Sequence, residues 1–291
     1  MNMAGKEIDA PTGIETTGHS WDGIKELNNP LPRWWLTVFY ISIVWSFAYW
    51  IFMPSWPGIS GHLKGTRNHS ERANVERAVA DLESMRADQM KRLLTVGSVS
   101  EIESDPDLQL FALTAGKSIF GDNCATCHGA GGQGNVGYPN LADDDWLWGG
   151  TLSDIQTTIH YGIRSDHPEA RINQMMGYGE TGALSGDQIS DVVEHVMTIS
   201  GRDADAAAAA RGAEVFAVQC VSCHGPDGKG MKALGAPNLT DGIWLYGGER
   251  QDIQKSLYFG RSGVMPAWTG RLSEEQMTAL AVYVHSLGGG E

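Results

Sequence analysis

Hydrophobic residues run from Trp34 to Met53 without a charged residue, over twenty positions. An α-helix of that length spans roughly 30 Å, the thickness of the hydrocarbon core of a bilayer. Prolines punctuate both sides of the segment, and tryptophans lie near both of its ends, as in the aromatic belts of membrane spans. A cleaved signal peptide would have a shorter apolar core and a small-residue cleavage site. We therefore expect one transmembrane helix over residues 34–53.

A second pattern follows between residues 69 and 95, where apolar positions recur at helical spacing among charges. Val75, Val79 and Leu82 begin this series, and Met85, Met90 and Leu93 continue it. The spacing predicts an amphipathic helix within a linker over residues 54–110. We expect this helix to pack on the following domain or on a partner subunit.

The remaining pattern occurs twice. Its matching elements are Gly116 and Phe120 with Gly212 and Phe216, Pro139-Asn140-Leu141 with Pro237-Asn238-Leu239, Tyr161-Gly162 with Phe259-Gly260, and the helix-capping residues Ser185 and Ser273. Alanine-rich residues 202–210 join the copies and enter the first helix of the second copy. We expect a mainly α-helical chain with tandem domains over residues 111–201 and 202–291, preceded by residues 1–33 and the membrane helix.

Charge changes the choice of partner more than the choice of fold. The chain of 291 residues has 35 Asp and Glu against 21 Lys and Arg, and a net charge of −14. A negative field repels nucleic acid and steers basic proteins toward the surface. The sequence therefore argues against a nucleic-acid partner and favours a basic protein partner.

All four cysteines lie in two copies of the pattern Cys-x-x-Cys-His, Cys124 to His128 and Cys220 to His224. This pattern is the attachment signature of c-type haem, in which both thiols bond the haem and the histidine ligates its iron. A zinc site would need its two Cys-x-x-Cys pairs about 15–20 residues apart, and a thioredoxin-like dithiol would lie near a βαβ pattern. Neither condition is met, so we expect two covalently bound c-type haems, with His128 and His224 as iron ligands.

Each copy resembles a class I cytochrome c domain, in which a first helix, the haem motif, a methionine loop and a final helix follow one another. The paired Gly116 and Phe120 resemble that family's helix-crossing residues. By the same resemblance Met265, in Val264-Met265-Pro266, is an iron ligand. A thioether ligand closes the iron and raises its reduction potential relative to a second imidazole.

The methionine loop of the first copy departs from the family pattern, because Met176 replaces the proline. Alignment on the following helix favours Met175 as the ligand over Met176, and leaves His167 or His160 as bis-histidine alternatives. Neighbouring domains can also exchange methionines, so that each domain ligates the iron of the other. The sequence leaves these pairings open.

Residues 19–35, with Trp21, Asn28-Asn29-Pro30 and Trp34-Trp35, carry a sharper resemblance. Followed by one anchor and two haem motifs, they resemble the dihaem subunit III of bacterial cbb3-type cytochrome c oxidases. The resemblance implies an inner-membrane protein with periplasmic haem domains, which takes electrons from a donor cytochrome c. It passes them through a monohaem subunit to a haem-copper catalytic subunit that reduces oxygen and pumps protons, and this chain itself has no catalytic site. The alternatives are a free-standing anchored carrier and a dihaem peroxidase.

Overall fold

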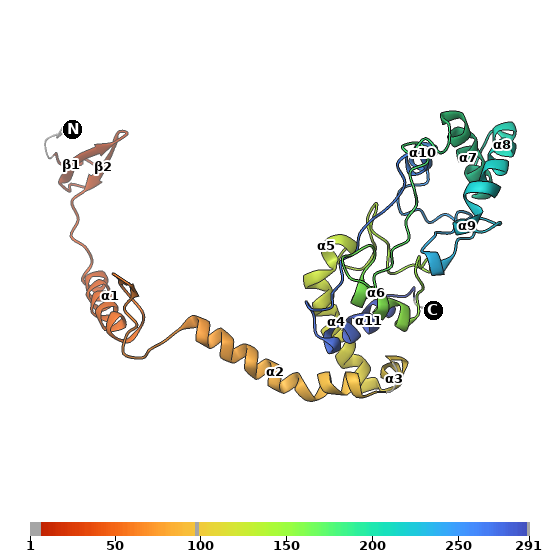
Figure 1. Cartoon of the computed structure of the whole chain (residues 1–291). Coiled ribbons are helices and arrows are strands. Elements are labelled where there is room, and N and C mark those ends of the chain that lie inside the picture. Colours follow the sequence, from red (N-terminus) through yellow and green to blue (C-terminus); the bar gives the residue numbers. More distant parts are fainter. Residues whose placement is uncertain (1–6, 97–98, 290–291) are drawn as a thin grey trace. The chain divides into compact units, whose positions relative to one another are not determined.

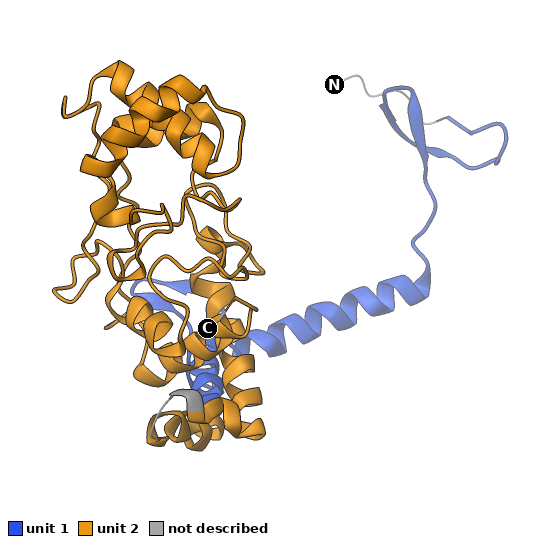
Figure 2. Ribbon diagram, turned by 90° about the vertical axis from the view of Figure 1, so that its right-hand side faces the viewer, with its two compact units in different colours: residues 1–83 blue, residues 84–291 orange. Residues whose placement is uncertain are grey.

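The computed structural model describes residues 7–96 and 99–289, and these residues form mainly helices. They divide into two compact units, Met1–Glu83 and Ser84–Glu291 (Figure 2). The mainly helical fold expected from the sequence is confirmed.

The smaller unit begins with a hairpin that the sequence patterns did not predict. Strands β1 (Thr16–Trp21) and β2 (Ile24–Leu27) pair antiparallel. Asp22 and Gly23 connect them with φ angles of 49° and 86°. Two consecutive positive φ angles define the type I′ turn that matches the twist of a hairpin, and Asp-Gly suits it because both residues tolerate that conformation.

Helix α1 (Arg33–Phe52) follows, and its bounds agree with the expected membrane segment to within one residue. It is long and apolar enough to cross a membrane, and none of its residues is buried within the structure. A short ladder of β3 (Pro57–Gly58) and β4 (Gly61–His62) comes after it.

Helix α2 (Glu71–Thr95) covers the segment over which the sequence predicts an amphipathic helix, and Val75, Val79, Leu82 and Met85 on it are exposed. Within the larger unit its end packs through Leu93, only 2% exposed, into a cluster that includes Leu108 and Ala279. Helix α3 (Val99–Ser104) then leads into the repeated region.

The repeated region contains the helices of both sequence copies. They are α4 (Pro106–Asn123), α5 (Ala125–His128), α6 (Leu152–Tyr161) and α7 (Gly186–Ile199) in the first copy, and α8 (Ala206–Gln219), α9 (Val221–His224), the 3₁₀ turn η1 (Lys232–Leu234), α10 (Arg250–Phe259) and α11 (Glu274–His285) in the second. Ser185 and Ser273 cap α7 and α11 through complete capping boxes, as their positions predict.

The helices do not pack copy by copy. Helix α4 lies against α11, and α7 lies against α8 (Figure 1). We call α4, α5, α6 and α11 module A, and α7, α8, α9 and α10 module B. Each module therefore takes its haem-motif helix from one copy and its final helix from the other.

Two glycines allow the close approach of these helices. A Cβ at Gly116 on α4 would lie 2.3 Å from the Ala279 carbonyl oxygen on α11, and one at Gly212 on α8 would lie 2.0 Å from that of Asp191 on α7. Both distances are shorter than any real contact, so a side chain at either position would push the helices apart. The expected helix-crossing role of Gly116 and Gly212 fits this packing, with the partner helix supplied by the other copy.

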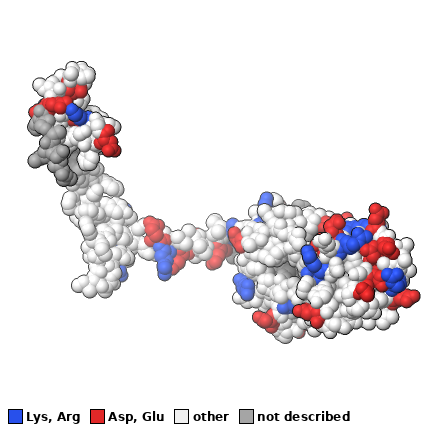
Figure 3. All heavy atoms as spheres, turned by 90° about the horizontal axis from the view of Figure 1, so that it is seen from above, with Lys and Arg blue, Asp and Glu red and all other residues white. Residues whose placement is uncertain are grey.

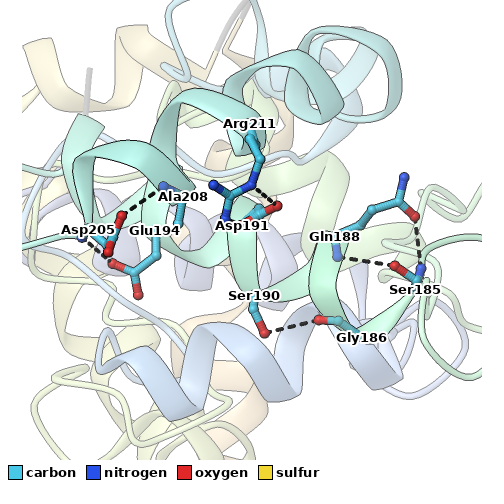
Figure 4. A network of polar contacts seen from close by, with 9 residues as sticks. All are labelled: Ser185, Gly186, Gln188, Ser190, Asp191, Glu194, Asp205, Ala208 and Arg211. Carbon is cyan, nitrogen blue, oxygen red and sulfur yellow. Dashed lines mark hydrogen bonds and ion pairs between the residues drawn. The ribbon is translucent and has the colours of Figure 1, made fainter.

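Polar contacts also join α7 to α8 in module B (Figure 4). The Arg211 guanidinium donates to both carboxylate oxygens of Asp191, at 2.6 and 2.9 Å. The Asp205 amide donates to Glu194 at 2.8 Å, and the Asp205 carboxylate caps α8 by accepting from Ala208. Because the two helices come from different copies, these contacts fix one copy against the other.

Candidate functional site

Each Cys-x-x-Cys-His motif lies at a junction between two helices, and the two junctions are equivalent. The first cysteine ends a long helix and begins a one-turn helix, with its amide donating to Phe120 at 2.8 Å in one motif and to Phe216 at 2.9 Å in the other. The turn places both thiols and the imidazole of each motif within five consecutive residues. The four cysteines form no disulfide.

The two motif histidines are oriented in the same way. Nδ1 of His128 lies 3.0 Å from the Pro139 carbonyl oxygen, and Nδ1 of His224 lies 3.0 Å from that of Pro237. A ring N–H at Nδ1 donates to this carbonyl and leaves the lone pair of Nε2 for a metal. The proline of the repeated Pro-Asn-Leu segment thus supplies the hydrogen-bond acceptor for the motif histidine. The sequence repeat showed this segment but gave it no role.

Burial lowers the pKa of His128 and of His224, while the hydrogen bonds to the proline carbonyls oppose that change. Both imidazoles are therefore held in the neutral form that binds a metal. Burial raises the pKa of Cys124 and Cys220 to about 11, so the unmodified thiols stay protonated. Zinc needs thiolates, and residues 7–96 and 99–289 contain no cluster of three or more His, Cys, Asp or Glu that would hold an ion.

A cavity of about 460 Å³ adjoins the second motif. Cys220, Cys223 and His224 line it together with Met175. Its other walls include the apolar side chains of Val192, Val196, Phe216, Ile253 and Leu257. The volume is in the range of cofactor sites, and the mixture of apolar walls with one imidazole and one thioether fits a c-type haem.

Met175 comes from the first copy, although the cavity holds the second motif. Its amide donates to the Arg261 carbonyl at 3.0 Å and its carbonyl accepts from the Arg261 amide at 2.9 Å. Its side chain packs against the module B core, which contains Phe216 and Cys220. Met176 is 47% exposed, so the side chain directed into the core is that of Met175.

Met265 occupies the reciprocal position. It exchanges backbone hydrogen bonds of 3.0 and 2.9 Å with Ile163, at the end of α6. Trp268 continues the same loop, donates its amide to Ile159 at 3.1 Å and packs on the module A core beside Cys124. The Met265 loop therefore belongs to module A, with the first haem motif, and Met265 does not line the cavity of the second motif.

The alternative histidines have other surroundings. The ring of His167 contacts Tyr161 at 4.8 Å between centroids, and Nδ1 of His167 accepts from the Glu169 amide. Nε2 of His160 lies 3.4 Å from a Glu274 carboxylate oxygen. Neither histidine lines the cavity that holds His224 and Met175.

Two contacts between a glycine and an aromatic ring join the first sequence copy to the second. Gly137 packs on Tyr246, and Gly235 packs on Trp148 so closely that a Cβ would lie 2.1 Å from the indole ring. Both glycines have positive φ, 85° and 62°. Each glycine precedes a repeated proline by two residues, and each aromatic residue belongs to the other copy. The sequence repeat pairs the two Pro-Asn-Leu segments but does not show that the preceding glycines contact aromatic residues of the other copy.

Comparison with known proteins covers most of the chain. Residues 13–60 match the family model for the N-terminal domain of cytochrome oxidase-cbb3, FixP. Residues 113–200 match the model for cytochrome c, and residues 207–284 match that for cytochrome c oxidase, cbb3-type, subunit III.

Several relatives are similar over nearly their whole length. The cbb3-type cytochrome c oxidase subunit FixP of Bradyrhizobium sp. (strain ORS 278) is 52% identical, with 98% of each chain covered. Subunit CcoP of Cereibacter sphaeroides is 50% identical, with 95% of each covered. Subunit CcoP of Azospirillum brasilense is 46% identical, with 99% of this chain and 100% of that protein covered.

Proposed function

This chain belongs to the FixP/CcoP family of cbb3-type cytochrome c oxidase subunits, and we propose that it is the dihaem subunit through which electrons reach the oxidase. The family makes it a cytochrome c electron-transfer subunit of a membrane-bound oxidase, with covalently bound c-type haem. The sequence-based identification of subunit III, the function and the tandem cytochrome c fold are confirmed. The number of haems, their ligands and their partners belong to the proposal.

Two haems are attached, one through Cys124 and Cys127 and the other through Cys220 and Cys223. The equivalent geometry of the two motifs supports this count, because each has a neutral imidazole held by a proline carbonyl at 3.0 Å. His128 ligates one iron and His224 the other.

Each sequence copy would supply the methionine that holds the haem of the other copy. Met175 would hold a haem iron together with His224, and Met265 would hold one together with His128. The observation that carries this assignment is the cavity, which holds His224 and Met175 but not Met265. Haem supplies reversible one-electron chemistry in such a site, and a thioether ligand raises its reduction potential. The buried aromatic and aliphatic walls exclude water, and the Pro139 and Pro237 carbonyls hold each imidazole in one tautomer.

The remaining assignments follow the expected organisation. Residues 1–33 lie in the cytoplasm, residues 34–53 cross the inner membrane, and residues 54–110 link them to haem copies 111–201 and 202–291 in the periplasm. The donor is a cytochrome c, and the acceptors are a monohaem cytochrome c subunit and a haem-copper catalytic subunit. Oxygen reduction and proton pumping belong to that catalytic subunit, and this chain contributes no catalytic residue.

Purification through a tag on this chain, after gentle detergent extraction, tests the assignment. We expect two haems c per chain, together with haem b, copper and a multi-span subunit in stoichiometric yield. The matched double variants Cys124→Ala/Cys127→Ala and Cys220→Ala/Cys223→Ala should each retain one covalent haem. Two haems c without haem b or copper would instead identify a free-standing carrier, and carbon monoxide binding by one reduced haem would favour a peroxidase.

A further inference from the structure

Two arginines line the cavity that adjoins the second haem motif, Arg164 from the first copy and Arg261 from the second. Both residues are partly buried. Nε of Arg261 donates to the Ser256 hydroxyl at 3.1 Å, and its guanidinium lies over the Tyr246 ring, 4.2 Å from the ring centroid. A hydroxyl and an aromatic ring therefore hold this guanidinium at the cavity wall, and neither of them neutralises its charge.

Backbone carbonyls hold the second guanidinium. Nε of Arg164 donates to the Gly263 carbonyl oxygen at 2.6 Å, and Nη1 donates to that of Asn173. Burial lowers the pKa of Arg164, and the Tyr246 phenol, rather than a carboxylate, opposes that change. Arg164 is thus a second cation at the cavity wall whose partners in the protein are uncharged.

Neither arginine has a carboxylate partner within residues 7–96 and 99–289. Arg171 offers a comparison, because it lies over the Trp148 ring at 5.2 Å and yet has its Nη2 3.6 Å from an Asp154 carboxylate oxygen. On the face of the larger unit that Figure 3 shows, Lys and Arg side chains lie among Asp and Glu side chains. A charge taken out of water without a counter-ion costs free energy. Two such arginines at one cavity therefore indicate an occupant with negative charges.

The backbone of Arg164 supports a role for its side chain. Its φ angle is 50°, in the left-handed region. Among the described residues other than glycine, Asp22 and Asn68 share a positive φ, and aspartate and asparagine tolerate this conformation better than arginine does. Strain of this kind persists where the surrounding structure or the function requires the residue. A long cationic side chain does not relieve the strain, so it is the guanidinium that the position uses.

The acidic side chains of the cavity belong to a separate cluster. Asp143 and Asp145 also line the cavity. Burial, Asp241 and Asp143 raise the pKa of Asp145 to about 6, and Lys232 lowers it. Neither arginine is among the groups that shift the pKa of Asp143 or Asp145. These carboxyls are therefore not the counter-ions of the two arginines.

We propose that Arg164 and Arg261 are positioning residues that hold the two carboxylates of the haem attached to Cys220 and Cys223. This inference rests on the proposed function. A haem carries two propionate groups, and a planar guanidinium binds a carboxylate through a pair of hydrogen bonds. Because Nε of each arginine already bonds the protein, the Nη groups are the donors for the haem. The first copy then holds the haem of the second copy at two points, through Met175 and through Arg164.

Redox titration of the purified full-length chain tests the charge. In the Cys124→Ala/Cys127→Ala background, the haem at the second motif is the one that remains. Arg164→Asn removes the guanidinium, while asparagine tolerates the positive φ. Loss of a nearby cation favours the oxidised haem, so the ratio of reduced to oxidised haem at a fixed potential should fall about tenfold, which is about 59 mV for one electron. Arg164→Lys should recover part of this loss.

Arg211→Asn is the matched control for the charge. Arg211 is exposed on α8, pairs with Asp191 at 2.6 Å and does not line the cavity. Removal of its charge should leave the potential nearly unchanged, because water screens an exposed pair. Equal shifts of the reduction potential in Arg164→Asn and Arg211→Asn would overturn the proposal.

Infrared difference spectroscopy tests the contact itself. In a chain whose haem carries isotope-labelled carboxylates, the redox-induced difference spectrum separates the haem carboxylate bands from those of Asp and Glu. Arg164→Asn and Arg261→Gln should each shift these bands, and Arg211→Asn should not. Haem carboxylate bands left unchanged by both cavity variants would overturn the proposal, even if the potential falls. The proposed function fails separately, if Cys220→Ala/Cys223→Ala removes no covalent haem.

Discussion

Met175 and Arg261 form a pair with two backbone hydrogen bonds, of 3.0 and 2.9 Å, although they belong to different sequence copies. Met265 and Ile163 form the reciprocal pair with the same two distances. Each methionine loop is therefore held by the segment that follows the third helix of the other copy. With the ligands proposed above, neither haem pocket is complete without residues from both copies, so we expect the copies to fold as one cooperative body.

Substitution of Gly116 tests the packing of α4 on α11. Gly116→Ala should destabilise the haem-loaded protein by about 1–3 kcal/mol, the usual cost of overpacking, because its Cβ would meet the Ala279 backbone. Thermal unfolding followed by circular dichroism measures the change.

Gly121→Ala on the same helix is the matched control, since no neighbouring atom lies within 4 Å of the added Cβ. It should stabilise the protein by up to about 1 kcal/mol through helix propensity. Equal effects of the two substitutions would show that α4 does not pack on α11 at Gly116.

An ion pair between the copies makes module B sensitive to acid. The Arg250 guanidinium hydrogen-bonds Glu194, with Nη2 3.0 Å from Oε2, and lowers the pKa of that carboxyl below its ordinary 4.5. A lowered folded-state pKa contributes stability above about pH 4.5 that disappears as the pH falls through the folded value.

Glu194→Gln should therefore lower the melting temperature at pH 7 and have progressively less effect below pH 4.5. Glu214→Gln, at an exposed position of α8, is the control. An effect of Glu194→Gln that stayed constant from pH 7 to pH 3 would show that the ionised Glu194 carboxylate does not stabilise the fold.

Local patterns predicted the elements well because their causes are local. The uncharged stretch 34–53 corresponds to α1, and Ser185 and Ser273 cap the final helices. The haem motifs identify their chemistry because thiols and imidazole must be adjacent in the chain. The hairpin at residues 16–27 was missed, although Asp22-Gly23 is a strong signal for a type I′ turn.

The sequence did not predict the exchange of final helices, because both copies carry the same interface signals. Gly116 and Gly212 lie at equivalent positions of the two copies, as do Phe120 and Phe216, so this local pattern does not choose between the two final helices. The length of the connection between α7 and α8 does indicate which final helix packs on which first helix. Helix α7 ends at Ile199 and α8 begins at Ala206, and a connection this short favours antiparallel neighbours. With α7 placed on α8, only α11 remains for α4.

Electrostatic steering predicts a salt effect on donor oxidation. The chain has a net charge of −14, so a basic donor approaches faster when screening is weak. At donor concentrations well below KM, turnover should fall as ionic strength rises from about 0.01 to 0.1 M, where the Debye length shortens from about 30 to about 10 Å. Oxidation of an uncharged dye should not respond. A flat profile for the donor would refute steering.

The exchanged ligation is tested most directly in a chain that carries one haem. In the Cys220→Ala/Cys223→Ala background, only the haem at Cys124 and Cys127 remains. Carbon monoxide binding by the reduced protein then reports whether its iron has lost the sixth ligand. If the ligands are exchanged, Met265→Ala opens this iron and Met175→Ala leaves it closed. An iron opened by Met175→Ala and left closed by Met265→Ala would contradict the exchange.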